Sequence, residues 1–275
     1  MKELLTRGIS GLLYVALLIL AMYWENALIV VLYIFGFVSL AEFRKLIKLN
    51  SILIPAIIFT LLYFGFWYWC MVHSSNTGTS EAIQILLVIT IFVNLFLIKD
   101  LFTFNKIPLF ESKRYIATTF YLSSGFVFML LIANYQSLFS PILLLGSFIL
   151  VWVNDSFAFI VGKNFGKQKL FPSISPKKTV EGFLGGLFFA CVASYFIAMF
   201  TDTSLSFTSW LILSIIISVF GTLGDLIESK FKRQAQVKDS GVIMPGHGGL
   251  LDRLDSIIFA APFIYLFLRI LTYVS

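Results

Sequence analysis

Charge is scarce in this chain, because Asp, Glu, Lys and Arg together make up only 12% of its 275 residues, whereas hydrophobic residues make up 59%. A soluble domain carries roughly 25% charged residues, so an ordinary soluble fold is excluded. Cysteine is also rare, and Cys70 and Cys191 both fall within hydrophobic runs. Neither a disulfide framework nor a thiolate metal site is therefore indicated. The composition predicts an all-α, polytopic membrane protein.

Long hydrophobic runs make up most of the sequence. A transmembrane helix needs about 20 predominantly apolar residues, and nine segments of the chain qualify. They lie at approximately 8–24, 27–43, 52–72, 82–98, 115–133, 141–161, 181–200, 208–227 and 256–273.

Basic residues are missing from alternate loops. With nine spans, all but one of the 20 Lys and Arg residues lie on one side of the membrane. The loops near Glu25, 73–81, 134–141 and 201–207 contain none. The positive-inside rule therefore predicts a cytoplasmic N-terminus and an external C-terminus in the cell (inner) membrane. The net charge of +6 then describes a surface suited to anionic lipids and phosphates, and it does not indicate nucleic-acid binding.

The two halves of the chain differ in their acidic residues. Those of the first half lie at span ends or in loops, where solvated charge is the default, and we expect no function from them: Glu3, Glu25, Glu42, Glu81, Asp100 and Glu111. We therefore divide the chain into an N-terminal scaffold of membrane helices, 1–140, and a C-terminal catalytic membrane domain, 141–275.

Carboxylates of the second half converge on one membrane depth. Asp155 lies about six residues, or ~9 Å, inside the sixth span, Asp225 ends the eighth, and Asp252 and Asp255 begin the ninth. Each alone could form an ion pair with Lys or Arg. Together, such costly intramembrane charges favour a divalent cation. Oxygen ligands suit Mg²⁺, with Mn²⁺ as the alternative, and a monovalent cation such as K⁺ is a further candidate.

The loop 162–186 combines glycines, hydroxyl groups and lysines before the seventh span. Ser175, Lys177, Lys178 and Thr179 could form a phosphate cradle with free backbone N–H groups at a helix N-terminus. The alternative is that the two lysines only reach the lipid headgroups. The Walker pattern G-x-x-x-x-G-K-[ST] is absent.

The segment 229–255, SKFKRQAQVKDSGVIMPGHGGLLDRLD, is a charged stretch between two hydrophobic runs. Its composition indicates that something charged binds there. His247 lies in a glycine-rich turn that a ligand could approach closely. Its spacing leaves three roles open: metal ligand, phosphate donor or turn residue.

This segment closely resembles the C-terminal signature of the phosphatidate cytidylyltransferase (CDP-diacylglycerol synthase) family. The match joins Ser229-Lys-Phe-Lys-Arg233, Lys238-Asp239, Pro245-Gly-His-Gly-Gly249 and Asp252-Arg-Leu-Asp255. So many fixed spacings are not expected by chance. Upstream, SPKKTVEG at 175–182 and GTLGD at 221–225 also resemble family motifs, so the resemblance covers roughly 150–255.

The resemblance implies transfer of a cytidylyl group from CTP to phosphatidate, which gives CDP-diacylglycerol and pyrophosphate for phospholipid synthesis. It implies catalytic roles for Asp225, Asp252, Lys238, His247 and Arg253. It implies substrate binding by Ser175, Lys177, Lys178, Thr179, Lys232, Arg233, Gly248 and Gly249. Asp225 and Asp252, with Asp155 and Asp255, would hold Mg²⁺. The acyl chains would stay in the lipid bilayer, and the protein would form a homodimer.

Two positions depart from the family pattern. Phe159 stands where the family usually has tyrosine, and Lys163 where it has arginine. A phenol hydrogen bond and a bidentate phosphate contact are therefore not carried over.

The same residues bear on three other functions. A related CTP-dependent transferase acting on another lipid phosphate or a polyprenol stays open, because only its apolar pocket would differ. A cation transporter would place charge at the bilayer midplane, with polar routes to both faces, whereas these acids crowd one face. A CDP-alcohol phosphatidyltransferase is disfavoured because its D-G-x-x-A-R run is absent.

Overall fold

The computed structural model describes most of the chain, with short gaps between the helices and one gap at His247. The described residues are 2–72, 77–103, 106–135, 139–201, 205–246 and 248–274.

Helices make up most of this structure, as the apolar runs predict. In chain order they are α1 (Lys2–Ala21), α2 (Glu25–Leu46), α3 (Leu53–Val72), α4 (Thr77–Phe102), α5 (Glu111–Ala117), the π-helical turn η1 (Thr118–Ser123), α6 (Ser124–Ala133), α7 (Pro141–Phe165), α8 (Val180–Phe200), α9 (Phe207–Gln234) and α10 (Leu251–Val274). A two-stranded antiparallel hairpin, β1 (Lys169–Phe171) and β2 (Ser175–Thr179), joins α7 to α8.

All nine predicted spans coincide with helical segments. The fifth span, 115–133, lies within a continuous helix made of α5, η1 and α6. Within the described residues, seven segments are long and apolar enough to cross a membrane: Glu25–Leu46, Glu81–Phe102, Glu111–Ala133, Pro141–Phe165, Val180–Phe200, Phe207–Gln234 and Leu251–Tyr273. Two further apolar helices, Gly8–Ala21 and Leu53–Tyr68, are shorter. The chain is thus an all-α, integral membrane protein.

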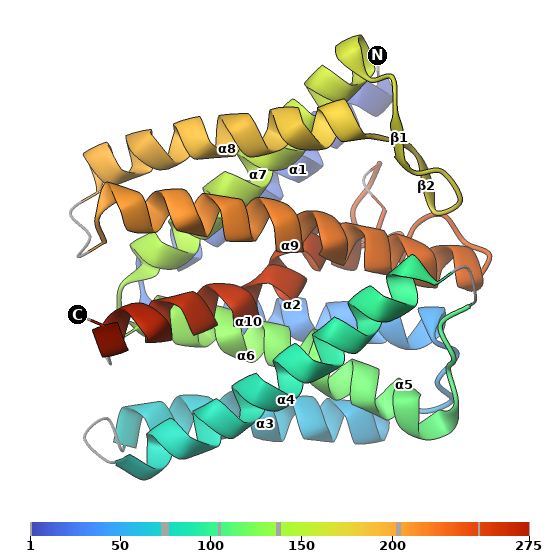
Figure 1. Ribbon diagram of the computed structural model, residues 1–275. Coiled ribbons are helices and arrows are strands. Elements are labelled where there is room, and N and C mark those ends of the chain that lie inside the picture. The colour runs from blue at the N-terminus through green and yellow to red at the C-terminus, as the bar shows by residue number, and fades with distance from the viewer. Residues whose placement is uncertain are drawn as a thin grey trace.

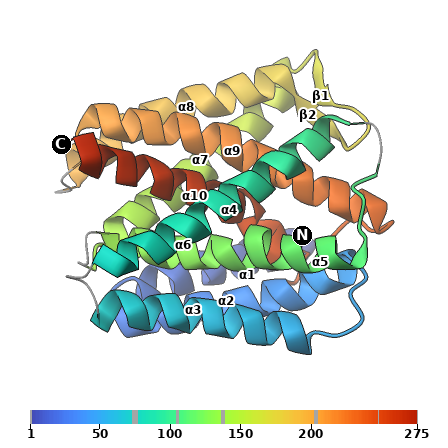
Figure 2. The same ribbon diagram turned by 60° about the horizontal axis from the view of Figure 1, so that its bottom comes forward.

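The helices pack into one bundle around α6 and α10 (Figures 1 and 2). Every residue of α6 is buried, and α6 packs on α10. Gly125 permits this approach, because a Cβ there would lie 2.7 Å from the Ile258 carbonyl oxygen. On one side α7, α8 and α9 pack against each other, and on the other α2 and α3 complete the bundle.

One end of the bundle gathers the polar connections. The β1–β2 hairpin, the α9–α10 connection and the C-terminal end of α2 lie together at the right of Figure 1, whereas α10 finishes at the opposite end. Asp225 on α9 reaches the hairpin, because it pairs with Lys178 of β2. Lys232 links Glu228 on α9 to Asp252 on α10.

Candidate active site

The α7–α8 pair is held together by small residues that place the hairpin. A Cβ at Gly182 of α8 would lie 2.7 Å from the Ala158 carbonyl oxygen and 3.0 Å from the Gly162 Cα atom of α7. Only glycine lets the two helix backbones approach this closely. The hairpin that connects them is thereby fixed at the end of the bundle.

The hairpin ends in a capped helix. The Thr179 hydroxyl oxygen accepts a hydrogen bond from the Gly182 N–H at 3.1 Å, which satisfies an orphan donor at the start of α8. The Glu181 carboxylate accepts from the N–H groups of Lys167 and Gln168, at 2.9 and 3.1 Å. Thr179, predicted to contact phosphate, thus has a capping role as well.

Lys178 is the residue through which the hairpin reaches the carboxylates. It forms an ion pair with Asp225 of α9, and Asp225 also accepts a hydrogen bond from the Ser229 hydroxyl at 3.2 Å. Burial by itself would lower the pKa of Lys178, but the Asp225 carboxylate outweighs it and, with Asp155 and Asp255, raises this pKa above its usual value. Lys178 is therefore a cation at neutral pH.

A second cation lies between α9 and α10. The Lys232 ammonium group is 2.5 Å from a Glu228 carboxylate oxygen and 2.7 Å from Asp252 Oδ1. The Glu228 side chain is fully buried, and the Lys232 ammonium group lies against it. Lys232 thus forms ion pairs with two carboxylates, and its binding of substrate phosphate stays a prediction.

Asp252 fastens the segment that precedes α10. Its carboxylate accepts hydrogen bonds from the N–H groups of Ser240, at 3.0 and 3.2 Å, and Gly249, at 2.8 Å. With Lys232, these contacts engage both carboxylate oxygens. We call residues 235–250 the signature loop, and Asp252 is one of its anchors.

Glu42 of α2 is the residue that sequence reasoning missed. We predicted that the acids of residues 1–140 would be solvated, and for Glu42 this prediction is wrong, because its side chain is only 2% exposed. Its carboxylate accepts hydrogen bonds from the Leu250 and Leu251 N–H groups at 3.2 and 2.9 Å, and from the Ser240 hydroxyl at 3.2 Å. Gly241 and Gly249 lie against the Glu42 carboxylate. No other feature of the sequence near Glu42 indicates that it contacts residues so far along the chain.

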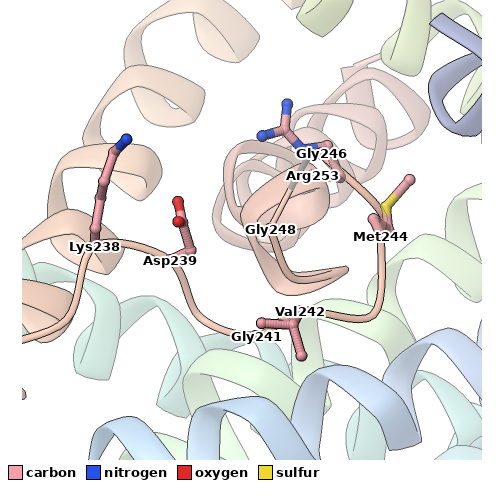
Figure 3. A pocket seen from close by; sticks show the side chains of 8 residues that line it. All are labelled: Lys238, Asp239, Gly241, Val242, Met244, Gly246, Gly248 and Arg253. Atoms are coloured by element: carbon pink, nitrogen blue, oxygen red, sulfur yellow. The ribbon is translucent and has the colours of Figure 1, made fainter. Parts of the chain in front are cut away.

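The signature loop and the start of α10 line an open, polar hollow of about 500 Å³. Figure 3 shows the polar ends of Lys238, Asp239 and Arg253 pointing to the same side of the loop, whereas Val242 points to the other. Gly248 lines it with a φ of +84°, a conformation that favours glycine. The hollow thus combines two cations with glycine backbone that an anionic ligand could approach.

The remaining predicted residues are distributed around this end. Arg233 donates from Nε to the Ile174 carbonyl oxygen at 3.3 Å, which ties α9 to the hairpin. Ser175 begins β2 and is partly buried, and Lys177 is exposed. The departures Phe159 and Lys163 are both exposed on α7, with the ammonium 6.0 Å from the ring centroid. His247 lies outside the described residues.

The four predicted metal ligands all lie on the helices that surround this site. Asp155, Asp225 and Asp255 come from three helices and lie within electrostatic range of one another. Their anionic oxygens are chemically suited to Mg²⁺. Among the described residues, however, no three His, Cys, Asp or Glu side chains are close enough to chelate one ion. In this structure the Lys178 ammonium group lies beside Asp225, and the metal site stays a prediction.

Comparison with known proteins covers nearly the whole chain. The model of the Cytidylyltransferase family matches residues 5–271. The phosphatidate cytidylyltransferase of Bacillus subtilis is 33% identical over 276 residues, 98% of this chain and 97% of that protein. The phosphatidate cytidylyltransferase of Staphylococcus saprophyticus is 50% identical over 125 residues, 46% of this chain and 48% of that protein. That of Staphylococcus haemolyticus is 49% identical over 125 residues, with the same coverage of both chains. On this match, the chain belongs to the Cytidylyltransferase family.

Proposed function

We propose that this protein transfers the cytidylyl group of CTP to phosphatidate, forming CDP-diacylglycerol and pyrophosphate. The relatives named above support the substrates, and the membrane helices fit a lipid acceptor. The observation that carries the proposal is the meeting of the hairpin with α9 through Lys178 and Asp225. This ion pair connects the hairpin to the carboxylates of α9, at the end of the bundle where the α9–α10 connection, which lines the polar hollow, also lies.

The chemistry requires two polyanions to meet. A phosphate oxygen of phosphatidate forms a bond to the α-phosphorus of CTP, while the bond from that phosphorus to the oxygen bridging the β-phosphorus breaks and pyrophosphate leaves. The attacking oxygen is already anionic near neutral pH, so no strong general base is needed. Lys238 and Arg253 at the hollow, with Lys178 beside Asp225, would orient the phosphates and offset their charge.

We further propose that the reaction uses Mg²⁺, with Mn²⁺ as a substitute and K⁺ as a further candidate. Asp225 and Asp252, with Asp155 and Asp255, would hold the ion. When bound, it would supply positive charge to the phosphates. The support for this proposal is that Asp155, Asp225 and Asp255 come from three helices and lie within electrostatic range of one another, and that their oxygens suit Mg²⁺.

The site is proposed to face the cytoplasm, where CTP is found, with the N-terminus on the same side and the C-terminus outside the cell membrane. Four connections rich in Lys and Arg support this orientation. The acyl chains of phosphatidate would remain in the bilayer beside α7–α10. Homodimer formation stays an expectation from the family.

Incorporation of labelled CTP into lipid by the purified protein tests this function. We expect product only with phosphatidate and a divalent cation, and none after chelation. Asp225→Asn removes the carboxylate beside Lys178 and should lower kcat roughly 100-fold. Glu111→Gln, an equal loss of charge at an exposed helix start, should leave activity unchanged.

Two results would contradict the proposal. Labelled product formed only with another lipid phosphate or a polyprenyl phosphate would assign the protein to a related CTP-dependent reaction. The absence of nucleotide transfer to any lipid, from folded wild-type protein, would exclude cytidylyl transfer altogether.

A further inference from the structure

The start of α10 is held by two carboxylates from different parts of the chain. Asp252 accepts the N–H of Gly249, and Glu42 accepts those of Leu250 and Leu251. The first amide groups of a helix have no intrahelical partner, and the helix dipole favours negative charge near them. Glu42 therefore compensates for the burial of its charge with hydrogen bonds from a helix start.

Ser240 connects the two carboxylates across the loop. Its backbone N–H donates to Asp252, and its hydroxyl donates to Glu42 at 3.2 Å. One end of the signature loop is thus bound at Ser240, and the other at residues 249–251. The segment between them contains Gly248 and Met244, which line the polar hollow.

Two glycines make room for the Glu42 side chain. A Cβ at Gly241 would overlap its Oε1 atom, and a Cβ at Gly249 would lie 2.5 Å from its Oε2 atom. Any larger residue would push the loop away from α2. Ser10 of α1 also donates a hydrogen bond to the Pro245 carbonyl oxygen at 3.0 Å, so a second N-terminal helix contacts the same loop.

We propose that Glu42 is a positioning residue, which fixes the signature loop so that the polar hollow has the shape required by the triphosphate of CTP. This rests on the proposed function. The N-terminal half then contributes to nucleotide binding indirectly, through the contacts of Glu42 with this loop. Glu42 acts through the backbone of residues 249–251 and through Ser240.

The test is the Glu42→Gln variant, which keeps the shape but replaces one acceptor oxygen with an NH₂ donor facing N–H groups. We expect the KM for CTP to rise roughly tenfold or more, because charged hydrogen bonds to the loop are lost. The KM for phosphatidate should change little, and the Tm should fall by roughly a few degrees, because a buried acceptor is lost. Glu111→Gln is the matched control and should leave all three values unchanged.

A second measurement does not depend on activity. Trypsin cleavage after Lys238, an exposed residue of the loop, should be faster in Glu42→Gln than in the wild type. Glu42→Asp retains the charge and should recover part of both the CTP affinity and the protection. If it behaves like Glu42→Gln, charge at this position is not what holds the loop, and the proposal fails.

The outcomes separate the two proposals. A wild-type protein without cytidylyl transfer would overturn the proposed function, while faster cleavage in Glu42→Gln would still support loop positioning. Unchanged CTP KM and unchanged cleavage in a folded Glu42→Gln protein would refute the role of Glu42. Equal loss of affinity for both substrates would show a general structural role instead, and would also refute it.

Discussion

Lys177 and Lys178 are neighbours in β2, yet they have different surroundings. Lys178 pairs with Asp225, whereas Lys177 is exposed. The side chains of Lys178 and Asp225 are 28% and 29% exposed, so solvent screens the attraction between them. The contribution of this ion pair to stability is therefore small. Because the pKa of Lys178 is raised, that contribution is fully present at neutral pH and is lost only as pH rises through the raised value. The Lys178–Asp225 ion pair therefore contributes little to stability, and substitution can test its proposed role in function.

Substitution of each lysine separates these roles. Lys178→Gln should lower kcat/KM for CTP roughly 100-fold while changing the free energy of unfolding by less than about 1 kcal/mol. Lys177→Gln, the matched control one residue away, should cost less than about tenfold, since it only weakens attraction between exposed charges. Steady-state kinetics and thermal unfolding measure both. Equal losses in the two variants would show that the ion pair is not what distinguishes them.

At the scale of the element, the α7–α8 pair sets the position of the hairpin. Gly182→Ala would place a methyl group against the backbone of α7, where neither the Ala158 oxygen nor the Gly162 Cα atom can move away without the helix. We expect a loss of about 1–3 kcal/mol in unfolding free energy. Activity should fall as well, because Lys178 follows the displaced hairpin.

Gly65→Ala in α3 provides the comparison. A Cβ at Gly65 meets nothing within 4 Å, and alanine has the higher helix propensity. Its Tm should therefore equal or exceed that of the wild type. Thermal unfolding in detergent checks both variants. A Gly182→Ala protein as stable as Gly65→Ala would mean that α7 and α8 do not approach as described.

The sequence predicts the helices well, but it predicts the contacts of the candidate site only in part. Nine apolar runs coincide with nine helical segments, since hydrophobic length alone requires a helix in the bilayer. The short strands of the hairpin were not predicted, because polar residues of 169–179 show no strand pattern. Glu42 was missed for a different reason: it lies 198 residues from Ser240. Its function depends on packing between distant helices, which one sequence does not encode locally.

At the scale of the whole molecule, the proposed function requires that the hairpin end of the bundle faces the cytoplasm, where CTP is found. The hairpin end carries the site, and the connection between α1 and α2 lies at the other end. In a protein with Cys70 and Cys191 replaced, Ser173→Cys would report the hairpin end and Asn26→Cys the opposite end; both residues are exposed.

A membrane-impermeant maleimide added to intact spheroplasts should label Asn26→Cys and not Ser173→Cys, because the basic loops retain the hairpin end inside. After permeabilisation both should react, which controls for accessibility. Each variant should also keep cytidylyl transfer, so that labelling reports the functional fold. Labelling of Ser173→Cys alone in intact spheroplasts would reverse the orientation and separate the site from cytosolic CTP. Labelling of both variants before permeabilisation would place Asn26 and Ser173 on the same side of the membrane. The chain would then cross the membrane an even number of times between them, which contradicts the predicted topology.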